Sequence, residues 1–176
     1  KELLTKRKIE KLATEYGFRS DMIEDGQLDN KKFEVFVSHS SRDVEFIRKV
    51  VFFLKKDKGV NGVYVDWQDP SMRHETNAQT AENLKERIKN VRKVIYVVTS
   101  ESLKSVWCSW EIGYADCSKG VDDVAILAIK PNNGRWKNQE YLQQYPWISY
   151  DLEERHFMVT RLDGNRSTLY DWLRKN

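Results

Sequence analysis

The feature that most constrains the fold is an alternation of apolar segments with strand and helix periods along the chain. Residues 94–98 (Val-Ile-Tyr-Val-Val) form a near-continuous apolar run, which indicates a strand that is buried on both faces. Further strands are expected at residues 33–37, 63–65, 124–129 and 157–160. Strands that alternate with helices over about 140 residues predict an α/β fold with a doubly wound parallel sheet of about five strands.

Helical periodicity connects these strands. Apolar side chains recur at helical spacing in four segments, at residues 44–54, 81–91, 107–117 and 169–173. Thr76 and Gln79 have the spacing of a capping box at the start of the second helix. Residues 132–150 are rich in Asn, Gln, Tyr and Trp, and we expect them to be irregular.

Residues 1–30 are expected to form an N-terminal helical extension and linker, before a main domain at residues 31–176. Ile9, Leu12, Ala13 and Tyr16 share one helical face, Gly17 offers a stop, and residues 21–30 are polar. We interpret the extension as a helix packed on the edge of the domain. A docking helix for another subunit is the alternative.

Charge and composition limit the partners and the compartment. The 30 basic residues are nearly balanced by 27 acidic ones, and the net charge of +3 argues against nucleic acid as a partner. No apolar run approaches the ~20 residues that cross a bilayer, and the first residues are too polar for a secretory signal. We therefore expect no membrane partner.

The two cysteines, Cys108 and Cys117, are separated by roughly 13 Å of helix rise, which is too far for a disulfide. Two free thiols favour a reducing, cytoplasmic location. No metal site is expected, because the two cysteines and three histidines show no ligand spacing.

The expected fold locates a ligand site. In open parallel sheets, ligands bind beyond the carboxyl ends of the strands, where the strand order reverses. A flavodoxin-like order of 2-1-3-4-5 puts this point between the first and third strands. Residues 38–41 (Ser-His-Ser-Ser) and the loop 99–106 would meet there, bordered by Asp66 and Trp67 after the second strand.

Glu111 lies at the edge of an aromatic stripe in the expected helix 107–117. Trp107, Trp110, Tyr114 and Cys117 share one side of this helix, and Glu111 lies about 40° around the helix from Trp107. A carboxylate beside aromatic rings is costly to desolvate unless it has a partner or a chemical role. Glu111 is therefore the candidate catalytic residue.

Motifs of other proteins with this architecture are missing from the sequence. Residues 38–40 and 99–100 hold Ser-His-Ser and Thr-Ser, where a phosphoacceptor receiver needs acidic side chains. Residues 38–41 contain no glycine for a flavin phosphate loop. The sequence has no Gly-rich dinucleotide fingerprint, no Walker loop and no Gly-x-Ser-x-Gly elbow.

Three motifs together carry a family resemblance. They are residues 33–43 (Phe-Glu-Val-Phe-Val-Ser-His-Ser-Ser-Arg-Asp), Asp66-Trp67, and Trp107-x-x-x-Glu111 preceded by Ser105. In these motifs the chain resembles the TIR (Toll/interleukin-1 receptor) domain family, and in particular its bacterial NAD-cleaving branch. The resemblance covers about residues 33 to 175 and is weak after Pro131.

The resemblance implies a flavodoxin-like fold and a function. The implied function is that of an NAD glycohydrolase or ADP-ribosyl cyclase, which releases nicotinamide and gives ADP-ribose or a cyclic ADP-ribose signal in bacterial antiphage defence. NAD would be the substrate, with no cofactor. The implied partners are further copies of the chain, joined by TIR–TIR contacts, and an effector protein that responds to the product.

Residues of the implied site follow from the matching motifs. Glu111 matches the catalytic glutamate, Trp107 matches the tryptophan one turn before it, and Val37, Ser38 and His39 match the strand edge that lines the nucleotide pocket. Four more residues complete the expected substrate-binding set: Ser40, Asp66, Trp67 and Arg73. The chain departs from the family at residues 69–76, which replace the usual Gly-containing turn in a loop that mediates head-to-tail assembly and gates the pocket in relatives.

Most of these residues also have a structural interpretation. Glu111 could be a surface glutamate that the macrodipole favours near a helix start, and Trp107 could serve packing alone. Ser38 and Ser40 could cap the following helix, and His39 could be a structural hydrogen-bonding residue.

The same holds for the loop residues and for the function as a whole. Trp67 could lie at the edge of the core, and Arg73 could be solvated. Cys108 is not expected to be a nucleophile, because the sequence places no histidine to activate it. Two other functions stay open, a non-catalytic module that signals through TIR–TIR contacts and a domain that senses a nucleotide without cleaving it.

Overall fold

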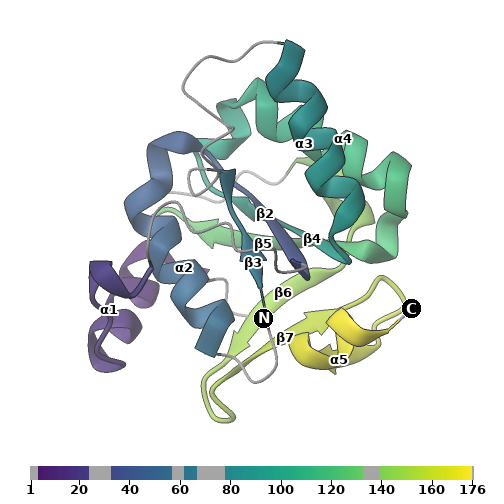
Figure 1. The fold of residues 1–176 in the computed structure, drawn as a ribbon. Helices are drawn as coiled ribbons and strands as arrows, with labels where there is room; N and C mark the ends of the chain where they lie inside the picture. The colour runs from purple at the N-terminus through teal and green to yellow at the C-terminus, as the bar shows by residue number, and fades with distance from the viewer. Residues whose placement is uncertain (1–3, 24–32, 57–61, 67–77, 133–138, 176) are drawn as a thin grey trace.

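The computed structural model describes residues 4–23, 33–56, 62–66, 78–132 and 139–175, which form one sheet with helices on both faces (Figure 1). The strands are β1 (Leu4–Thr5), β2 (Val35–Ser38), β3 (Val63–Tyr64), β4 (Lys93–Val98), β5 (Val124–Lys130), β6 (Trp147–Asp151), β7 (His156–Thr160) and β8 (Arg166–Thr168). The α-helices are α1 (Lys6–Glu15), α2 (Val44–Lys56), α3 (Ala78–Asn90), α4 (Val106–Lys119) and α5 (Leu169–Arg174).

The strand order confirms the expected fold class. The strands lie in the order β3-β2-β4-β5-β6-β7-β8, and β1 pairs with β5 beside this path. Neighbouring strands from β3 to β6 are parallel, whereas β7 and β8 continue the sheet as antiparallel strands. Numbered from β2 onward, the parallel part has the flavodoxin-like order 2-1-3-4-5. The order therefore reverses between β2 and β4, as expected.

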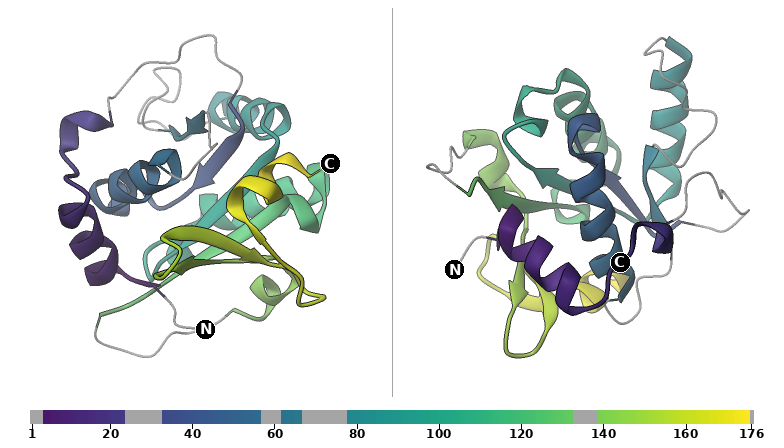
Figure 2. Two further views of the ribbon diagram at one scale, coloured as in Figure 1. Left: turned by 90° about the horizontal axis from the view of Figure 1, so that it is seen from below. Right: turned by 90° about the vertical axis from the view of Figure 1, so that its left-hand side faces the viewer.

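Side chains of the central strands alternate between two hydrophobic clusters. In β4, Ile95 and Val97 pack in the cluster that includes residues of α1, α2 and α5. Val94, Tyr96 and Val98 pack in the other cluster, with residues of α3 and α4. Figure 2 shows the helices on either side of the sheet. Because both faces of β4 are covered, the strand is apolar at nearly every position.

The N-terminal extension contains the expected helix. Ile9 and Ala13 of α1 are buried against the main hydrophobic cluster, and α1 lies beside α2 (Figure 1). Gly17 has a φ of +69°, a conformation that suits glycine at a helix end. Residues 24–30 of the expected linker lie outside the described part of the chain, and the division of the chain near residue 30 stays a prediction.

The expectation of irregular structure over 132–150 was wrong for its second half. Residues 147–151 form β6, which pairs in parallel with β5, and Glu140–Gln144 form a 3-10 helix. The strand expected at 157–160 is β7, which forms an antiparallel hairpin with β6. Ile148 is the one fully buried side chain of β6, so the sequence of this strand lacks a clear apolar period.

The remaining helices agree with the periodicity. Leu84 and Ile88 of α3 are buried, and so are most of the expected inward side chains of α2 and all of those of α5. Val44 and Ala81, at or near the starts of α2 and α3, are only partly buried. Thr76 of the expected capping box lies outside the described residues. Among the helices that the structure describes, none is both long and apolar enough to cross a membrane.

Candidate active site

The candidate site forms where the end of β2 faces the second turn of α4. Ser38 is the last residue of β2, and Ser105 caps α4 by accepting a hydrogen bond from the amide of Cys108. The hydroxyl of Ser38 donates to Oε2 of Glu111 across 2.5 Å, and both side chains are buried. Two segments that are 73 residues apart in the sequence are thereby joined by one buried hydrogen bond.

The helix presents Glu111 differently from the sequence-based expectation. The buried face of α4 consists of Cys108, Glu111, Ile112 and Ala115. These residues have the i, i+3, i+4 and i+7 spacing of an inward face, and three of them are small or branched apolar side chains that fit close to the sheet. Glu111 therefore lies on the buried face itself, at its border with the aromatic stripe, and with 5% of its surface exposed it is not a surface glutamate.

The expected aromatic stripe flanks this face. Trp107, Trp110 and Tyr114 are partly buried and pack against the core, whereas Cys117 at the end of the stripe is exposed. The rings pack on one another: Trp107 meets Trp110 edge to face at 5.6 Å, and Trp110 stacks on Tyr114 at 5.7 Å. Indole and phenol rings are too large for the close approach of α4 to the sheet, and they cover the border of the core instead.

The environment of Glu111 favours its neutral form. The pKa of Glu111 is raised to about 8: burial raises it most, the hydrogen bond from Ser38 lowers it, and the nearby carboxylate of Asp66 raises it. Without a ligand, the carboxyl group is therefore mostly protonated at neutral pH. Such a shift is typical of carboxyl groups with a chemical role, because a structural role alone rarely justifies burying one.

Cys108 is next to Glu111 on the buried face, yet it is not activated. Burial raises the pKa of the Cys108 thiol to about 12, and the Glu111 carboxylate adds to this effect. Because the thiolate is the reactive form, this cysteine is a packing residue and not a nucleophile.

His39 and Asp66 bring the end of β3 to the same place. Nδ1 of His39 lies 2.9 Å from the carbonyl oxygen of Val37, and since a carbonyl only accepts, Nδ1 carries a proton. Nε2 of His39 then faces Oδ1 of Asp66 across 3.3 Å. The imidazole is buried, and the Asp66 side chain is 39% exposed. An imidazole and two carboxyl groups thus converge at the switch point of the sheet.

The other expected site residues take different positions. The hydroxyl of Ser40 accepts from the amide of Arg42 and caps a short 3-10 helix, Ser41–Asp43, which matches the capping interpretation. Val37 packs in the cluster beneath α2, so only its backbone faces the site. Trp67 and Arg73, with the rest of the loop 68–77, lie outside the described residues.

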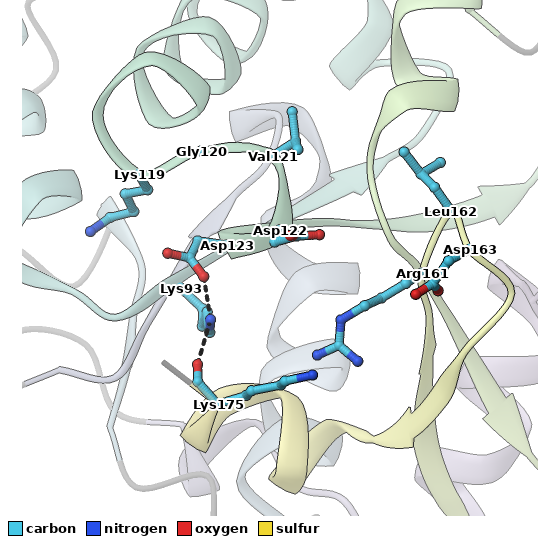
Figure 3. Close-up of a pocket in the computed structure, with 10 residues that line it drawn as sticks. All are labelled: Lys93, Lys119, Gly120, Val121, Asp122, Asp123, Arg161, Leu162, Asp163 and Lys175. Carbon is cyan, nitrogen blue, oxygen red and sulfur yellow. Dashed lines mark hydrogen bonds and ion pairs between the residues drawn. The ribbon is translucent and has the colours of Figure 1, made fainter.

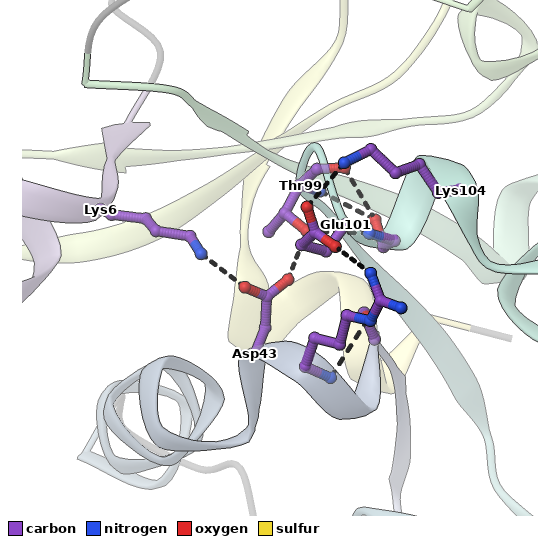
Figure 4. Close-up of polar contacts among 8 residues, drawn as sticks. Lys6, Asp43, Thr99, Glu101 and Lys104 are labelled. Atoms are coloured by element: carbon purple, nitrogen blue, oxygen red, sulfur yellow. Dashed lines mark hydrogen bonds and ion pairs between the residues drawn. The ribbon is translucent and has the colours of Figure 1, made fainter.

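Sequence reasoning missed a buried network beside the site. Asp43 is buried, and its Oδ2 accepts a hydrogen bond of 2.5 Å from the hydroxyl of Thr99, while Oδ1 accepts one from Lys6 (Figure 4). Ser40 and Asp43 have the Ser-x-x-Asp spacing of a helix start, and this local interpretation hid the long-range role of the aspartate. No sequence signal identifies Thr99 or Lys6 as its partners.

A cavity lies at the opposite end of the strands. It has a volume of about 680 Å³ and opens between the amino ends of β4 and β5, the end of α4 and the β7–β8 turn (Figure 3). Several of its charged groups are engaged with neighbours: Lys93 pairs with Asp123, and Asp163 accepts from Asn165. This cavity does not include the residues at the switch point, and we do not assign the candidate chemistry to it.

Within the described ranges, no three His, Cys, Asp or Glu side chains are grouped so as to hold a metal ion.

Comparison with known proteins identifies the family. Residues 35–161 match the family model described as the TIR domain. The chain belongs to the TIR domain family. The matched TIR region includes β2, β3, α4 and therefore the whole contact between Ser38 and Glu111, and it begins after α1. The family resemblance drawn from the three sequence motifs is thereby confirmed.

Curated relatives of this TIR domain include two bacterial proteins. The chain is 33% identical over 125 residues to "Probable 3' cyclic ADP-D-ribose synthase ThsB'" of Bacillus cereus (strain MSX-D12), which covers 68% of this chain and 62% of the relative. It is also 33% identical over 97 residues to "Putative cyclic ADP-D-ribose synthase TIR2" of Cytobacillus dafuensis. This match covers 53% of this chain and 25% of the relative. The chain thus spans less than two thirds of the length of either relative.

Among solved structures, the TIR domain of the Toll-related receptor TRR-2 from Hydra magnipapillata aligns with a TM-score of 0.44 and 20% identity. The alignment covers 62% of this chain and 78% of that one.

The buried carboxyl group predicts a pH dependence of stability. The pKa of Glu111 is about 8 in the folded state against a reference value of 4.5, so between these values the folded state binds more protons than the unfolded state. The free energy of unfolding should therefore fall as the pH rises through this window, by up to about 1.4 kcal/mol per pH unit. Urea titrations of wild type and Glu111→Gln from pH 5 to 9 measure this contribution, because other groups cancel in the difference. The free energy of unfolding of the variant relative to the wild type should rise with pH up to about pH 8 and then level off. A difference that does not change with pH would contradict the burial of an ionisable Glu111.

Proposed function

We propose that the protein cleaves the bond between nicotinamide and ribose in NAD and releases ADP-ribose or a cyclic ADP-ribose product. The observation that carries this proposal is the buried Glu111, held by Ser38 at the switch point of a TIR domain. Two bacterial relatives named as cyclic ADP-D-ribose synthases support the same reaction class.

The chemistry requires one carboxylate. Nicotinamide in NAD is already a cationic leaving group, so its departure needs no general acid. The barrier comes from the positive charge that develops on the ribose, as in other glycosyl transfers through oxocarbenium-like states. A fixed carboxylate near that carbon stabilises the transition state more than the ground state. We assign this role to Glu111. Water attack then gives ADP-ribose, whereas attack by a nucleophilic atom of the same molecule gives a cyclic product.

Burial links the ionisation of Glu111 to substrate binding. The neutral carboxyl group of the free protein would lose its proton when the cationic nicotinamide riboside lies beside it, because an opposite charge lowers the pKa of a carboxyl group. The charged group then forms in a site with little water, where its field is strong. The hydroxyl of Ser38 supports the ionised form through its hydrogen bond.

Other residues at the switch point would bind the nucleotide. We propose that His39, Asp66 and the edge of β2 contact the ribose, and that Trp107 and Trp67 border the pocket as aromatic surfaces. Arg73 would contact the phosphates. The roles of the β2 edge, His39, Asp66, Trp67 and Trp107 extend the family motifs to matching positions of this chain, whereas Arg73 lies in the segment that departs from the family.

A non-catalytic interaction module is the second function considered. Interaction alone does not account for a buried carboxyl group with a raised pKa next to a serine donor. A nucleotide sensor would show NAD binding without product.

The enzyme proposal predicts the loss of activity in Glu111→Gln. This isosteric change removes the negative charge, and nicotinamide release from NAD should fall by about 10²-fold or more. The matched control is Glu86→Gln on the exposed side of α3, which should retain wild-type turnover. Release is measured by chromatography with mass spectrometry of the products. Turnover that is undiminished in Glu111→Gln would refute the assignment, and NAD bound by the wild type without product would identify a sensor.

The raised pKa predicts a pH profile. Because kcat/KM reports the ionisation of the free enzyme, it should rise about tenfold per pH unit below a midpoint near 8 and level off above it. The Ser38→Ala variant loses a hydrogen bond that favours the carboxylate, so its midpoint should move to higher pH. Initial rates at low NAD concentration between pH 6 and 9.5 give both profiles. A flat profile in the wild type would show that Glu111 does not act as proposed.

We further propose that activity requires assembly through TIR–TIR contacts and that the product signals to an effector protein. Specific activity should therefore rise with protein concentration or with a molecular crowder, because the active form is an oligomer. Nicotinamide release over an about 100-fold range of protein concentration provides the test, because that range takes a simple association from mostly dissociated to mostly assembled. Constant specific activity over this range would show that a single chain suffices.

A further inference from the structure

Asp43 joins three segments that are distant in the sequence. It ends the 3-10 helix that follows the turn after β2, and its side chain is 2% exposed. One carboxylate oxygen accepts a hydrogen bond of 2.5 Å from the hydroxyl of Thr99, at the carboxyl end of β4. The other lies 2.5 Å from the ammonium group of Lys6, the first residue of α1. Figure 4 shows Lys6 and Thr99 reaching Asp43 from opposite sides.

Thr99 in turn fixes the segment that leads to α4. Its amide donates to the hydroxyl of Ser102 across 2.8 Å, and the amide of Ser102 donates to the Thr99 hydroxyl oxygen across 3.0 Å. The turn then runs into Ser105, the cap of α4, which lies about 1.7 helical turns before Glu111. The position of Glu111 therefore depends on the turn that Asp43 holds.

The same aspartate holds the turn that follows Ser38. The amide of Asp43 donates to the carbonyl oxygen of Ser40 across 2.9 Å. Asp43 thus binds both turns from which the two partners of the Ser38–Glu111 hydrogen bond emerge. An exposed pair between the same turns, Arg42 with Glu101 at 3.2 Å, adds little because solvent screens it.

Lys6 provides the counter-charge from outside the TIR region. The matched family region begins at residue 35, whereas Lys6 belongs to the extension formed by β1 and α1. Its place is fixed by the pairing of β1 with β5, and its ammonium group lies 5.2 Å from the ring centre of Phe46. A buried carboxylate that loses its cation carries an uncompensated charge, which weakens everything bound to it.

We propose that Asp43 is a positioning residue of the candidate active site, and that residues 4–15 support this site through the Lys6–Asp43 ion pair. The kinetic part of this inference rests on the proposed function. The extension then contributes to activity, and its displacement would lower activity by releasing the turns that follow β2 and β4.

The first test is hydrogen exchange, which needs no turnover. In Lys6→Met, the amides of Asp43, Thr99 and Ser102 should exchange about tenfold faster than in the wild type, because the ion pair no longer holds their turns. The control is Lys11→Met on the same helix, where the side chain is 78% exposed, and it should leave these amides unchanged. Lys6→Arg keeps the charge and should restore the wild-type pattern.

The second test is kinetic. Lys6→Met should lower kcat for nicotinamide release on the order of tenfold with KM within about twofold, because the carboxyl group is misplaced and not removed. Asp43→Asn keeps an oxygen that can accept from Thr99 and leaves no buried charge. It should likewise lower kcat and leave KM nearly unchanged. Should Lys6→Met prove unstable, Asp43→Asn takes its place in the kinetic test, because it leaves no unpaired buried charge.

The outcomes separate the two proposals. If exchange and kcat of Lys6→Met and Asp43→Asn match those of Lys11→Met, the extension does not support the site and the inference is overturned. If the wild type releases no nicotinamide, the proposed function fails, and exchange alone decides whether Lys6 holds the two turns.

Discussion

The hydrogen bond from Ser38 to Glu111 is the interaction on which the remaining account depends. It joins the sheet to α4 inside the core and gives the buried carboxyl group a hydrogen-bond donor. A buried carboxyl group without a donor costs several kcal/mol, so the fold supplies a serine at the end of β2 and accepts a raised pKa. The group is kept neutral but remains close to ionisation, which is the state that a cationic substrate can change.

The architecture explains why this contact forms at the switch point. Alternate side chains of β2 and β4 face opposite helical layers, so Ser38 faces α4 while Val37 faces α2. Because the strand order reverses between β2 and β4, the turns after these strands diverge and leave α4 to cover the gap. Asp43 then ties the diverging turns together beneath that gap. The position of the candidate nucleotide site therefore follows from the topology. The contacts of Asp43 hold together the two turns that border this site.

Much of this arrangement could be predicted from the sequence, but the contacts between distant residues could not. The strands from β2 to β5 follow from periodicity, and the flavodoxin-like order was implied by the family resemblance. With that order, the rule for parallel sheets brings residue 38 near the helix with Glu111. Periodicity singled out the aromatic side of α4, and the buried face made by Cys108, Glu111, Ile112 and Ala115 was not predicted, because the large rings dominate the apolar pattern of this helix. β6 escaped detection because Ile148 is its one buried side chain, so its sequence lacks the alternation of a strand with one covered face. The partners of Asp43 are 37 and 56 residues away, and only the folded chain brings them together.

The ionisation of Glu111 is the most direct test of this account. In protein labelled with ¹³C at the side-chain carboxyl carbon of glutamate, the Glu111 resonance is assigned by its absence in Glu111→Gln and followed by NMR from pH 4 to 10. The account predicts a midpoint near 8 without ligand, because burial disfavours the charge. A midpoint near the reference value of 4.5 would contradict it, since the carboxyl group would then be solvated and the proposed site would lose its charge-sensitive centre.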